Sequence, residues 1–128
     1  RVGYALGSEE LIGILRKCSA SWNLNVCAQK AAVAGLADQE YYQEQKAKIV
    51  EGREYLEKEM AALGCRVYPS QSNFIYFDTG KDPAWIQEQL MEKGIRIGAF
   101  EMSRVSVGTM EECKLYIKAL KEILEAAE

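Results

Sequence analysis

One long uninterrupted helix constrains the fold of this chain more than any other feature. From Asp38 to Leu63 the sequence has no proline and a single glycine, Gly52, which predicts one helix. Apolar residues recur every seven positions along it: Tyr42, Ile49, Leu56 and Leu63. At about 1.5 Å per residue, such a helix is ~40 Å long, which is more than the width of a small domain. We therefore expect it to bridge two bodies. We also expect Gly52 to reduce the stability of the helix, because glycine has a low helix propensity.

The sequence after Gly64 changes to short segments in which apolar and polar residues alternate. Strands are predicted within four stretches: 65–68, 73–77, 95–100 and 104–107. A helix is predicted between Asp82 and Gly94, and a last helix begins at Thr109, which forms a capping box with Glu112. The order strand, strand, helix, strand, strand, helix predicts an α/β chain with a small two-layer α+β domain. Its helices should lie on one face of a mainly antiparallel sheet.

The sequence before the long helix predicts the edge of another body. Residues 1–7, "RVGYALG", are interpreted as a short strand, and Ser8 as the N-cap of a helix. Residues 19–25 predict a loop, and the alanine-rich stretch from Val26 predicts a closely packed, buried helix. The chain starts with an arginine that opens into a strand-like run, so we expect it to be a piece of a longer protein. The chain is thus predicted to consist of the edge of another body (1–37), a bridging helix (38–63) and a small domain (64–128).

Composition and charge exclude several classes of function. The formal net charge of −3, with lysines and acids interspersed, gives no attraction for nucleic acid or an anionic membrane. No apolar run has the length of a membrane span and no signal-peptide pattern is present, so a cytoplasmic protein is expected. The four cysteines contain no C-x-x-C pair and the chain has no histidine. No metal site is therefore predicted, and nucleophiles that depend on histidine are excluded. We expect the thiols to be buried in a reducing compartment.

Arg104 is the candidate for binding chemistry in the second half of the chain. In "SRVSVGT", Val105 and Val107 alternate with Arg104 and Ser106, so the valines should face the helices and Arg104 the opposite side of the sheet. One interpretation is a solvent-facing arginine on an open sheet. The other is a planar, permanently charged group that binds a carboxylate in a bidentate way. The local pattern does not decide between the two.

Four motifs carry a resemblance to a known family. "RVGY", "WNLN", "VYPSQSNF" and "RVSVGT" follow one another as in histidinol-phosphate aminotransferases, within the aspartate-aminotransferase-like superfamily of pyridoxal-phosphate enzymes. The resemblance covers essentially the whole chain. It implies the C-terminal segment of that fold, with residues 1–37 at the edge of the large cofactor-binding domain. It also implies an aminotransferase of amino-acid biosynthesis that is a homodimer in its full-length form.

The resemblance assigns roles to individual residues. Arg1 matches an arginine that helps to hold the phosphate of pyridoxal 5′-phosphate, and Arg104 matches the arginine that binds the anionic group of the substrate, typically an α-carboxylate. Asn23, with Trp22 and Asn25, matches a segment that approaches the substrate pocket of the neighbouring subunit. Asn23 and Asn25 are also typical of residues that end a loop and cap the next helix. The Schiff-base lysine would fall before residue 1, so this chain supplies no catalytic residue, the cofactor is bound mainly elsewhere, and we expect no activity from the chain alone.

One position departs from the family pattern. Gly98 stands where histidinol-phosphate aminotransferases have an arginine that is linked to the phosphate end of their substrate, and Arg96 lies two residues earlier on the same predicted strand face. The substrate is therefore left open as an amino acid or an amine derived from one, with a 2-oxo acid as the other reactant. Two alternatives remain: a pyridoxal-phosphate decarboxylase on the same fold, and a non-enzymatic binding module.

Overall fold

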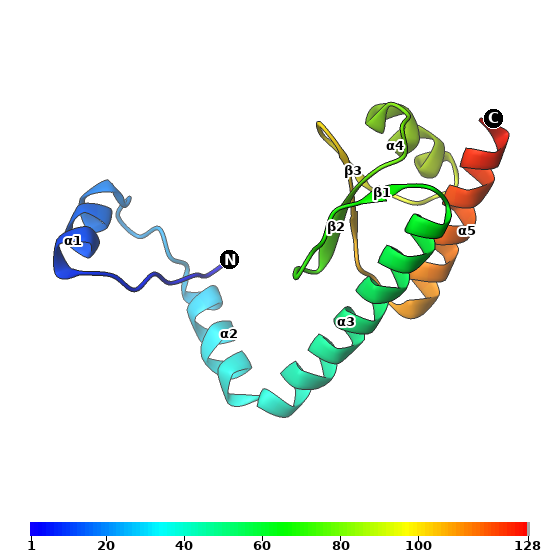
Figure 1. Ribbon diagram of the computed structural model, residues 1–128. Coiled ribbons are helices and arrows are strands. Elements are labelled where there is room, and N and C mark those ends of the chain that lie inside the picture. The colour runs from blue at the N-terminus through cyan, green and yellow to red at the C-terminus, as the bar shows by residue number, and fades with distance from the viewer. Residues whose placement is uncertain (128) are drawn as a thin grey trace. The chain divides into compact units, whose positions relative to one another are not determined.

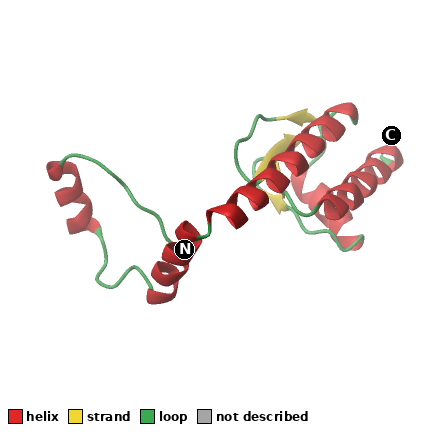
Figure 2. Ribbon diagram, turned by 90° about the horizontal axis from the view of Figure 1, so that it is seen from below, coloured by secondary structure: helices red, strands yellow, loops and turns green. Residues whose placement is uncertain are grey.

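The computed structural model describes residues 1–127 and divides the chain into two compact units, Arg1–Gln43 and Glu44–Glu128. The helices in the described residues are α1 (Glu9–Cys18), α2 (Val26–Ala37), α3 (Gln39–Ala62), α4 (Pro83–Glu92) and α5 (Met110–Ala126) (Figure 1). The strands are β1 (Arg66–Val67), β2 (Phe74–Asp78), β3 (Gly98–Ala99) and β4 (Ser103–Ser106). All of these strands, yellow in Figure 2, belong to the second unit.

The sheet of the second unit is antiparallel throughout, in the order β1-β2-β4-β3. Strand β4 therefore has a neighbour on each side, and Arg104 pairs with Tyr76 of β2 and with Gly98 of β3. The edges are formed by β1 and β3, which have only two residues each. The longest side chain of β4 is thus placed in the interior of the sheet.

One hydrophobic core lies between this sheet and helices α3, α4 and α5 (Figure 1). The Tyr116 hydroxyl of α5 donates a hydrogen bond of 3.6 Å to Met60 Sδ of α3, and the Tyr116 ring meets the Phe77 ring of β2 edge-on. Side chains with no accessible surface or almost none come from helices and strands alike: Leu56, Met60, Ile75, Phe77, Ile86, Leu90 and Leu120. The predicted two-layer arrangement, with helices on one face of an antiparallel sheet, is confirmed.

Local signals set the helix ends as predicted. Gly64 has a φ of +82°, a conformation that glycine adopts without strain, and the Cys65 N–H donates to the Met60 carbonyl at 3.1 Å to close α3. At the start of α5, the Thr109 N–H donates to Glu112 Oε2 at 2.7 Å, and the Glu112 N–H donates to Thr109 Oγ1 at 3.3 Å. This reciprocal capping box, through the bonds that the Thr109 N–H and hydroxyl donate, lowers the pKa of Glu112.

Gly52 has a packing role that the sequence did not reveal. It is buried in α3, and a Cβ atom at this position would lie 2.8 Å from Val107 Cγ1, with Cys113 Sγ and the Gly108 carbonyl at 3.6 Å. The absent side chain therefore lets α3 approach the connection between β4 and α5. Gly52, which was expected only to weaken the helix, is a position at which α3 closely approaches Val107.

Three expectations for the rest of the chain are wrong. Residues 1–7 contain no strand, because a strand needs a hydrogen-bonded neighbour and the described strands pair only with one another. Helix α2 has no buried residue, and Leu36 is 74% exposed, because the first unit contains no sheet on which α2 could pack. Two of the four thiols, those of Cys18 and Cys27, are exposed.

Helix α3 occupies almost the predicted range and is the longest helix of the described chain. The predicted division into 1–37, 38–63 and 64–128, with α3 as a bridge, stays a prediction. Within residues 1–127, no helix combines the length and the apolar character that crossing a bilayer requires.

We predict that Gly52→Ala lowers the free energy of unfolding of the second unit by up to about 2 kcal/mol. Alanine favours a helix by about 1 kcal/mol, but overpacking against the stiff Val107 side chain costs about 1–3 kcal/mol. Urea unfolding followed by circular dichroism measures the change. Glu54→Ala, an exposed position on the same helix, is the control and should shift stability by less than about 0.5 kcal/mol. A Gly52→Ala variant that is more stable than the parent would contradict the close contact.

We also predict that the four thiols react in two classes. Burial raises the pKa of the Cys65 thiol to about 11, with a smaller contribution from the charge of Asp78, and burial also raises the pKa of Cys113. At about pH 8 an aromatic disulfide reagent should therefore label Cys18 and Cys27 rapidly, and the other two only on unfolding. Replacing Cys18 and Cys27 with serine should abolish the rapid phase. Rapid labelling of all four thiols in the folded chain would show that the core is not closed around Cys65 and Cys113.

Candidate functional site

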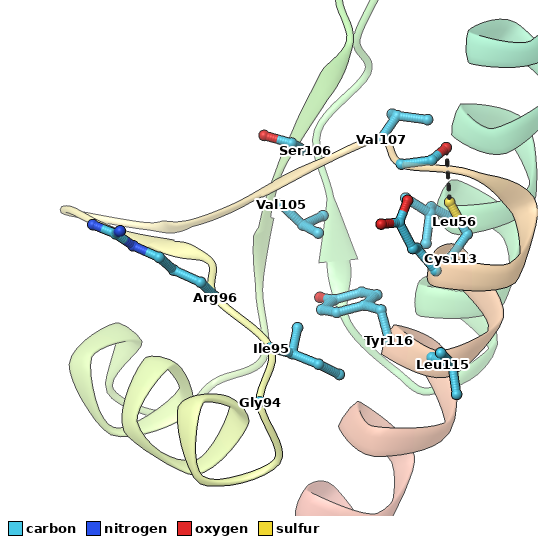
Figure 3. A pocket seen from close by; sticks show the side chains of 12 residues that line it. Leu56, Gly94, Ile95, Arg96, Val105, Ser106, Val107, Cys113, Leu115 and Tyr116 are labelled. Carbon is cyan, nitrogen blue, oxygen red and sulfur yellow. Dashed lines mark hydrogen bonds between the residues drawn. The ribbon is translucent and has the colours of Figure 1, made fainter.

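The candidate site lies on the face of the sheet that the helices leave uncovered. Along β4, Ser103 and Val105 are buried, whereas Arg104 is half-buried and Ser106 is exposed. Figure 3 shows the Val105 side chain directed toward Tyr116 and the Ser106 side chain directed away from it. The predicted alternation is therefore confirmed, and Arg104 stands on the face opposite the core.

Two aromatic rings hold the guanidinium group of Arg104. Its central carbon lies 5.2 Å from the centroid of the Phe74 ring in β2 and 5.2 Å from that of the Phe100 ring, which follows β3. Among the described residues, no carboxylate lies within ion-pair distance of Arg104. Each contact of this kind contributes about 0.5–1 kcal/mol at an exposed site and more when desolvated. The rings thus restrict the position of Arg104, and no carboxylate of the described residues pairs with its guanidinium N–H groups.

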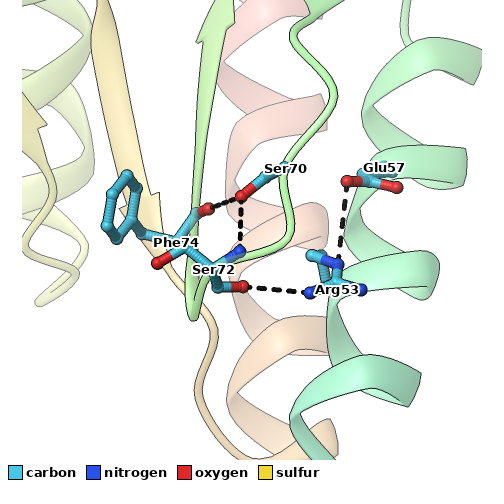
Figure 4. A network of polar contacts seen from close by, with 5 residues as sticks. All are labelled: Arg53, Glu57, Ser70, Ser72 and Phe74. Carbon is cyan, nitrogen blue, oxygen red and sulfur yellow. Dashed lines mark hydrogen bonds and ion pairs between the residues drawn. The ribbon is translucent and has the colours of Figure 1, made fainter. Parts of the chain in front are cut away.

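The backbone around Phe74 is fixed by a network that begins on α3 (Figure 4). The Ser70 hydroxyl donates to the Phe74 carbonyl at 2.6 Å and accepts a hydrogen bond of 3.1 Å from the Ser72 N–H. Arg53 of α3 donates from Nη1 to the Ser72 carbonyl at 3.2 Å. The Phe74 ring also meets the Tyr76 ring edge-on, with 5.6 Å between centroids. The predicted turn between β1 and β2 therefore anchors one of the two rings that contact Arg104.

A polar cavity of about 470 Å³ lies beside Arg104. Arg96 and Ser106 also line it, and Gln87 of α4 closes one side by donating from Nε2 to the Ile97 carbonyl at 2.7 Å. The cavity is bounded by two guanidinium groups and by no carboxylate of the described residues. An anionic ligand is the occupant that this charge distribution favours.

A second cavity, of about 410 Å³, lies on the helix side of the sheet (Figure 3). Its side chains are mostly apolar, and Arg96 at its margin points away from Tyr116. Burial raises the pKa of Tyr116 well above its ordinary value and also raises that of Cys113, whose thiol donates to the Gly108 carbonyl at 3.7 Å. Neither group is therefore suited to proton transfer near neutral pH. The carboxyl group that lines this cavity, that of Glu112, caps α5.

The residues predicted for the cofactor and for the partner subunit lie in the first unit. Arg1 and Asn23 are exposed and their side chains make no hydrogen bond or ion pair with the described residues. Trp22, at φ +62°, is 98% exposed. Asn25 caps α2, because its Oδ1 accepts the Ala28 N–H at 2.7 Å. The capping alternative is thus confirmed for Asn25. The roles of Arg1 and Asn23 stay predictions.

Sequence reasoning missed the aromatic residues of the site. Phe74 was recognised only as part of a strand and of the family motif, and Phe100 only as the end of another strand. Phe74 could have been found from the pairing of β2 with β4, because it lies diagonally across from Arg104 on the same face. No pattern indicated Phe100, whose ring reaches Arg104 from an irregular connection.

Comparison with known proteins agrees with the resemblance. The family model described as "Aminotransferase class I and II" matches residues 1–120. The chain belongs to this aminotransferase family. The histidinol-phosphate aminotransferase of Moorella thermoacetica is 34% identical to it over 130 residues, which cover 97% of this chain and 34% of that relative. The chain therefore spans about a third of the length of this aminotransferase.

Solved structures give the same picture of the fold. The histidinol-phosphate aminotransferase of Sinorhizobium meliloti, solved in complex with pyridoxal 5′-phosphate, is 31% identical with a TM-score of 0.67, over 77% of this chain and 29% of that one. A decarboxylase of Sulfurospirillum multivorans has a TM-score of 0.74 at 21% identity, over 93% of this chain and 38% of that one. The latter likeness shows the fold alone. The expectation of a C-terminal segment of the aminotransferase fold is confirmed.

Proposed function

We propose that this chain is the C-terminal part of a pyridoxal-phosphate-dependent aminotransferase of the histidinol-phosphate aminotransferase type. The complete protein would transfer an amino group between an amino acid, or an amine derived from one, and a 2-oxo acid. The observation that carries the proposal is Arg104, a guanidinium group without an acidic partner in the described chain, held between two rings beside a cationic cavity. Family membership supplies the reaction class.

Arg104 would act by binding and orientation. A guanidinium group binds a carboxylate through two parallel hydrogen bonds, which fixes both the position and the plane of the ligand. Holding the carboxylate in this way limits rotation of the substrate about its Cα atom, so that one bond at Cα faces the cofactor. This is a positioning effect, and no acid–base step is assigned to Arg104.

The cofactor would be held mainly by the part of the protein that this chain does not include. Arg1 is the only residue here for which a cofactor contact is proposed. Its exposed side chain has no partner among the described residues and so fits a phosphate oxygen. Bound pyridoxal phosphate supplies the electron sink for amino-group transfer. We further propose that the chain alone is inactive, and that the complete protein is a cytoplasmic homodimer in which Asn23 lies near the partner's substrate pocket.

A decarboxylase on the same fold is the second candidate. The specific support is a cavity whose two arginines can hold a substrate with more than one acidic group, and the fold itself is shared with a decarboxylase of Sulfurospirillum multivorans. Analysis of products from the complete protein separates the candidates, because a decarboxylase releases carbon dioxide and retains the amino group. A complete protein that never develops cofactor absorbance on titration with pyridoxal phosphate would instead favour the binding module.

We predict that Arg104→Ala in the complete protein raises KM for the amino donor and lowers kcat/KM by about 30- to 5,000-fold. Loss of a hydrogen-bonded charge pair costs about 2–5 kcal/mol, because the carboxylate is left without its partner. Arg66→Ala removes an exposed arginine from the edge strand β1 of the same sheet and serves as the control. Steady-state kinetics measure both variants. An unchanged kcat/KM in Arg104→Ala would remove this residue from the substrate site.

We predict a smaller and more selective effect for Arg96→Met. Arg96 is exposed at the margin of the cavity, so its interaction with a second anionic group is screened by water and contributes about two- to fivefold in kcat/KM. Donors with a second carboxylate or a phosphate group should lose this factor, whereas donors with a single carboxylate should not. Kinetics with L-glutamate, O-phospho-L-serine and L-leucine test this difference. Equal losses for all three donors would show that Arg96 does not recognise the second anion.

A further inference from the structure

We propose that Phe100 is a positioning residue for Arg104, and that the absence of a side chain at Gly98 leaves the space in which the Phe100 ring lies. The ring and Phe74 would together fix the plane of the guanidinium group for a carboxylate ligand. This inference rests on the proposed role of Arg104 in substrate binding. It adds two residues, Phe100 and Gly98, to which neither the family membership nor the proposed function assigns a role in the site.

The first observation is that the two rings lie at the same distance from the guanidinium group. The Arg104 guanidinium carbon lies 5.2 Å from both ring centroids. Phe74 belongs to the interior strand β2 and is held by the network from Ser70 and Arg53. Phe100 is 61% exposed, and its backbone N–H donates to the Met102 carbonyl at 3.1 Å in the turn between β3 and β4. One contact is therefore part of the sheet, whereas the other depends on a side chain at the surface.

The second observation concerns Gly98, which pairs directly with Arg104 across the β3–β4 ladder. A Cβ atom at this position would lie 2.7 Å from Phe100 Cε2, and two further ring atoms would lie at 3.5 Å. The φ of Gly98 lies outside the left-handed region, so its backbone conformation is open to other residues. Space is therefore the reason for glycine. A side chain at position 98 and the ring in its present place exclude each other.

An exposed ring in this position has a physical consequence for Arg104. Arginine has several rotatable bonds, and each contact with a ring face removes alternative guanidinium orientations before the ligand arrives. Loss of the Phe100 contact would leave Arg104 charged and still in contact with Phe74, but less restricted. The carboxylate would then bind less tightly, and the chemical step itself would change little. KM should rise more than kcat falls.

The test uses the complete protein and a comparison between two donors. One donor is the amino acid that the parent protein uses best, chosen from the common amino acids, and the other is its α-carboxamide, which has the same shape without the negative charge. The ratio of their kcat/KM values measures recognition of the carboxylate. Phe100→Leu should lower this ratio about two- to fivefold, mainly through KM. Phe100→Tyr, which keeps the ring, should restore most of the ratio.

Gly98→Ala provides an independent arm, because it displaces the ring without altering it. We expect the same loss as in Phe100→Leu. The double variant Gly98→Ala/Phe100→Leu should be no worse than either single variant, since the methyl group then has no aromatic ring to displace. Losses that multiply in the double variant would overturn the proposed link between the two positions.

A matched control lies on the same sheet. Tyr68 contacts Arg66 at 5.1 Å in another cation–π pair, so Tyr68→Leu removes an equivalent ring away from Arg104 and should leave the ratio unchanged. Arg104→Met, which removes the positive charge and keeps an unbranched side chain, separates the two proposals. If it keeps the ratio, the proposed role of Arg104 fails. If it loses the ratio while Phe100→Leu and Gly98→Ala both keep it, only the positioning by Phe100 fails. Circular dichroism of each variant checks that the fold is intact.

Discussion

The alternation of side chains along β4 is the constraint on which the second unit depends. This strand lies between two neighbours, so its side chains cannot turn to an edge and must point either into the core or away from it. Val105 points inward and completes the core beneath α3 and α5, while Arg104 points outward onto the bare face. A shift of one residue in the pairing would bury the guanidinium and expose the valine. The pairing of β4 with its neighbours therefore determines both the packing of Val105 in the core and the position of Arg104 on the opposite face.

The same strand fixes what lies around it. The Val107 N–H donates to the Asn73 carbonyl at 2.8 Å, which joins the end of β4 to the start of β2. Val107 itself fills the space that Gly52 leaves open on α3. The long helix, the central strands and the start of α5 thus meet at a single point. Rigid support behind Arg104 follows from this junction, because each of its parts is held by an element distant in sequence.

The features that could be predicted from the sequence are those with local causes. The capping box of Thr109 and Glu112, the ends of α3 and α4 at glycines with positive φ, and the alternation in β4 all depend on residues within a few positions of one another. The orientation of Arg104 followed from that alternation. Its proposed role came from the resemblance, since the pattern also allowed a solvent-facing arginine.

The features that escaped prediction depend on partners far away in the sequence or on irregular backbone. Residues 1–7 have the alternation of a strand but no neighbour in the described chain to bond with. Gly52 looked like a helix weakness because Val107 lies more than fifty positions away. Gly98 looked like the loss of a charge, whereas the turn that follows it places the Phe100 ring over the vacant space. In each case the deciding contact is absent from the local sequence.

The rings around Arg104 also determine what an arriving anion has to displace. In many proteins an arginine of this kind is neutralised by a neighbouring acid, and a ligand must compete with that acid for the same donors. Here the aromatic faces are weak, uncharged neighbours that leave the rim of the guanidinium plane open. An anion that binds Arg104 would therefore displace no carboxylate of the described residues, and its binding would be opposed mainly by the removal of water from both partners.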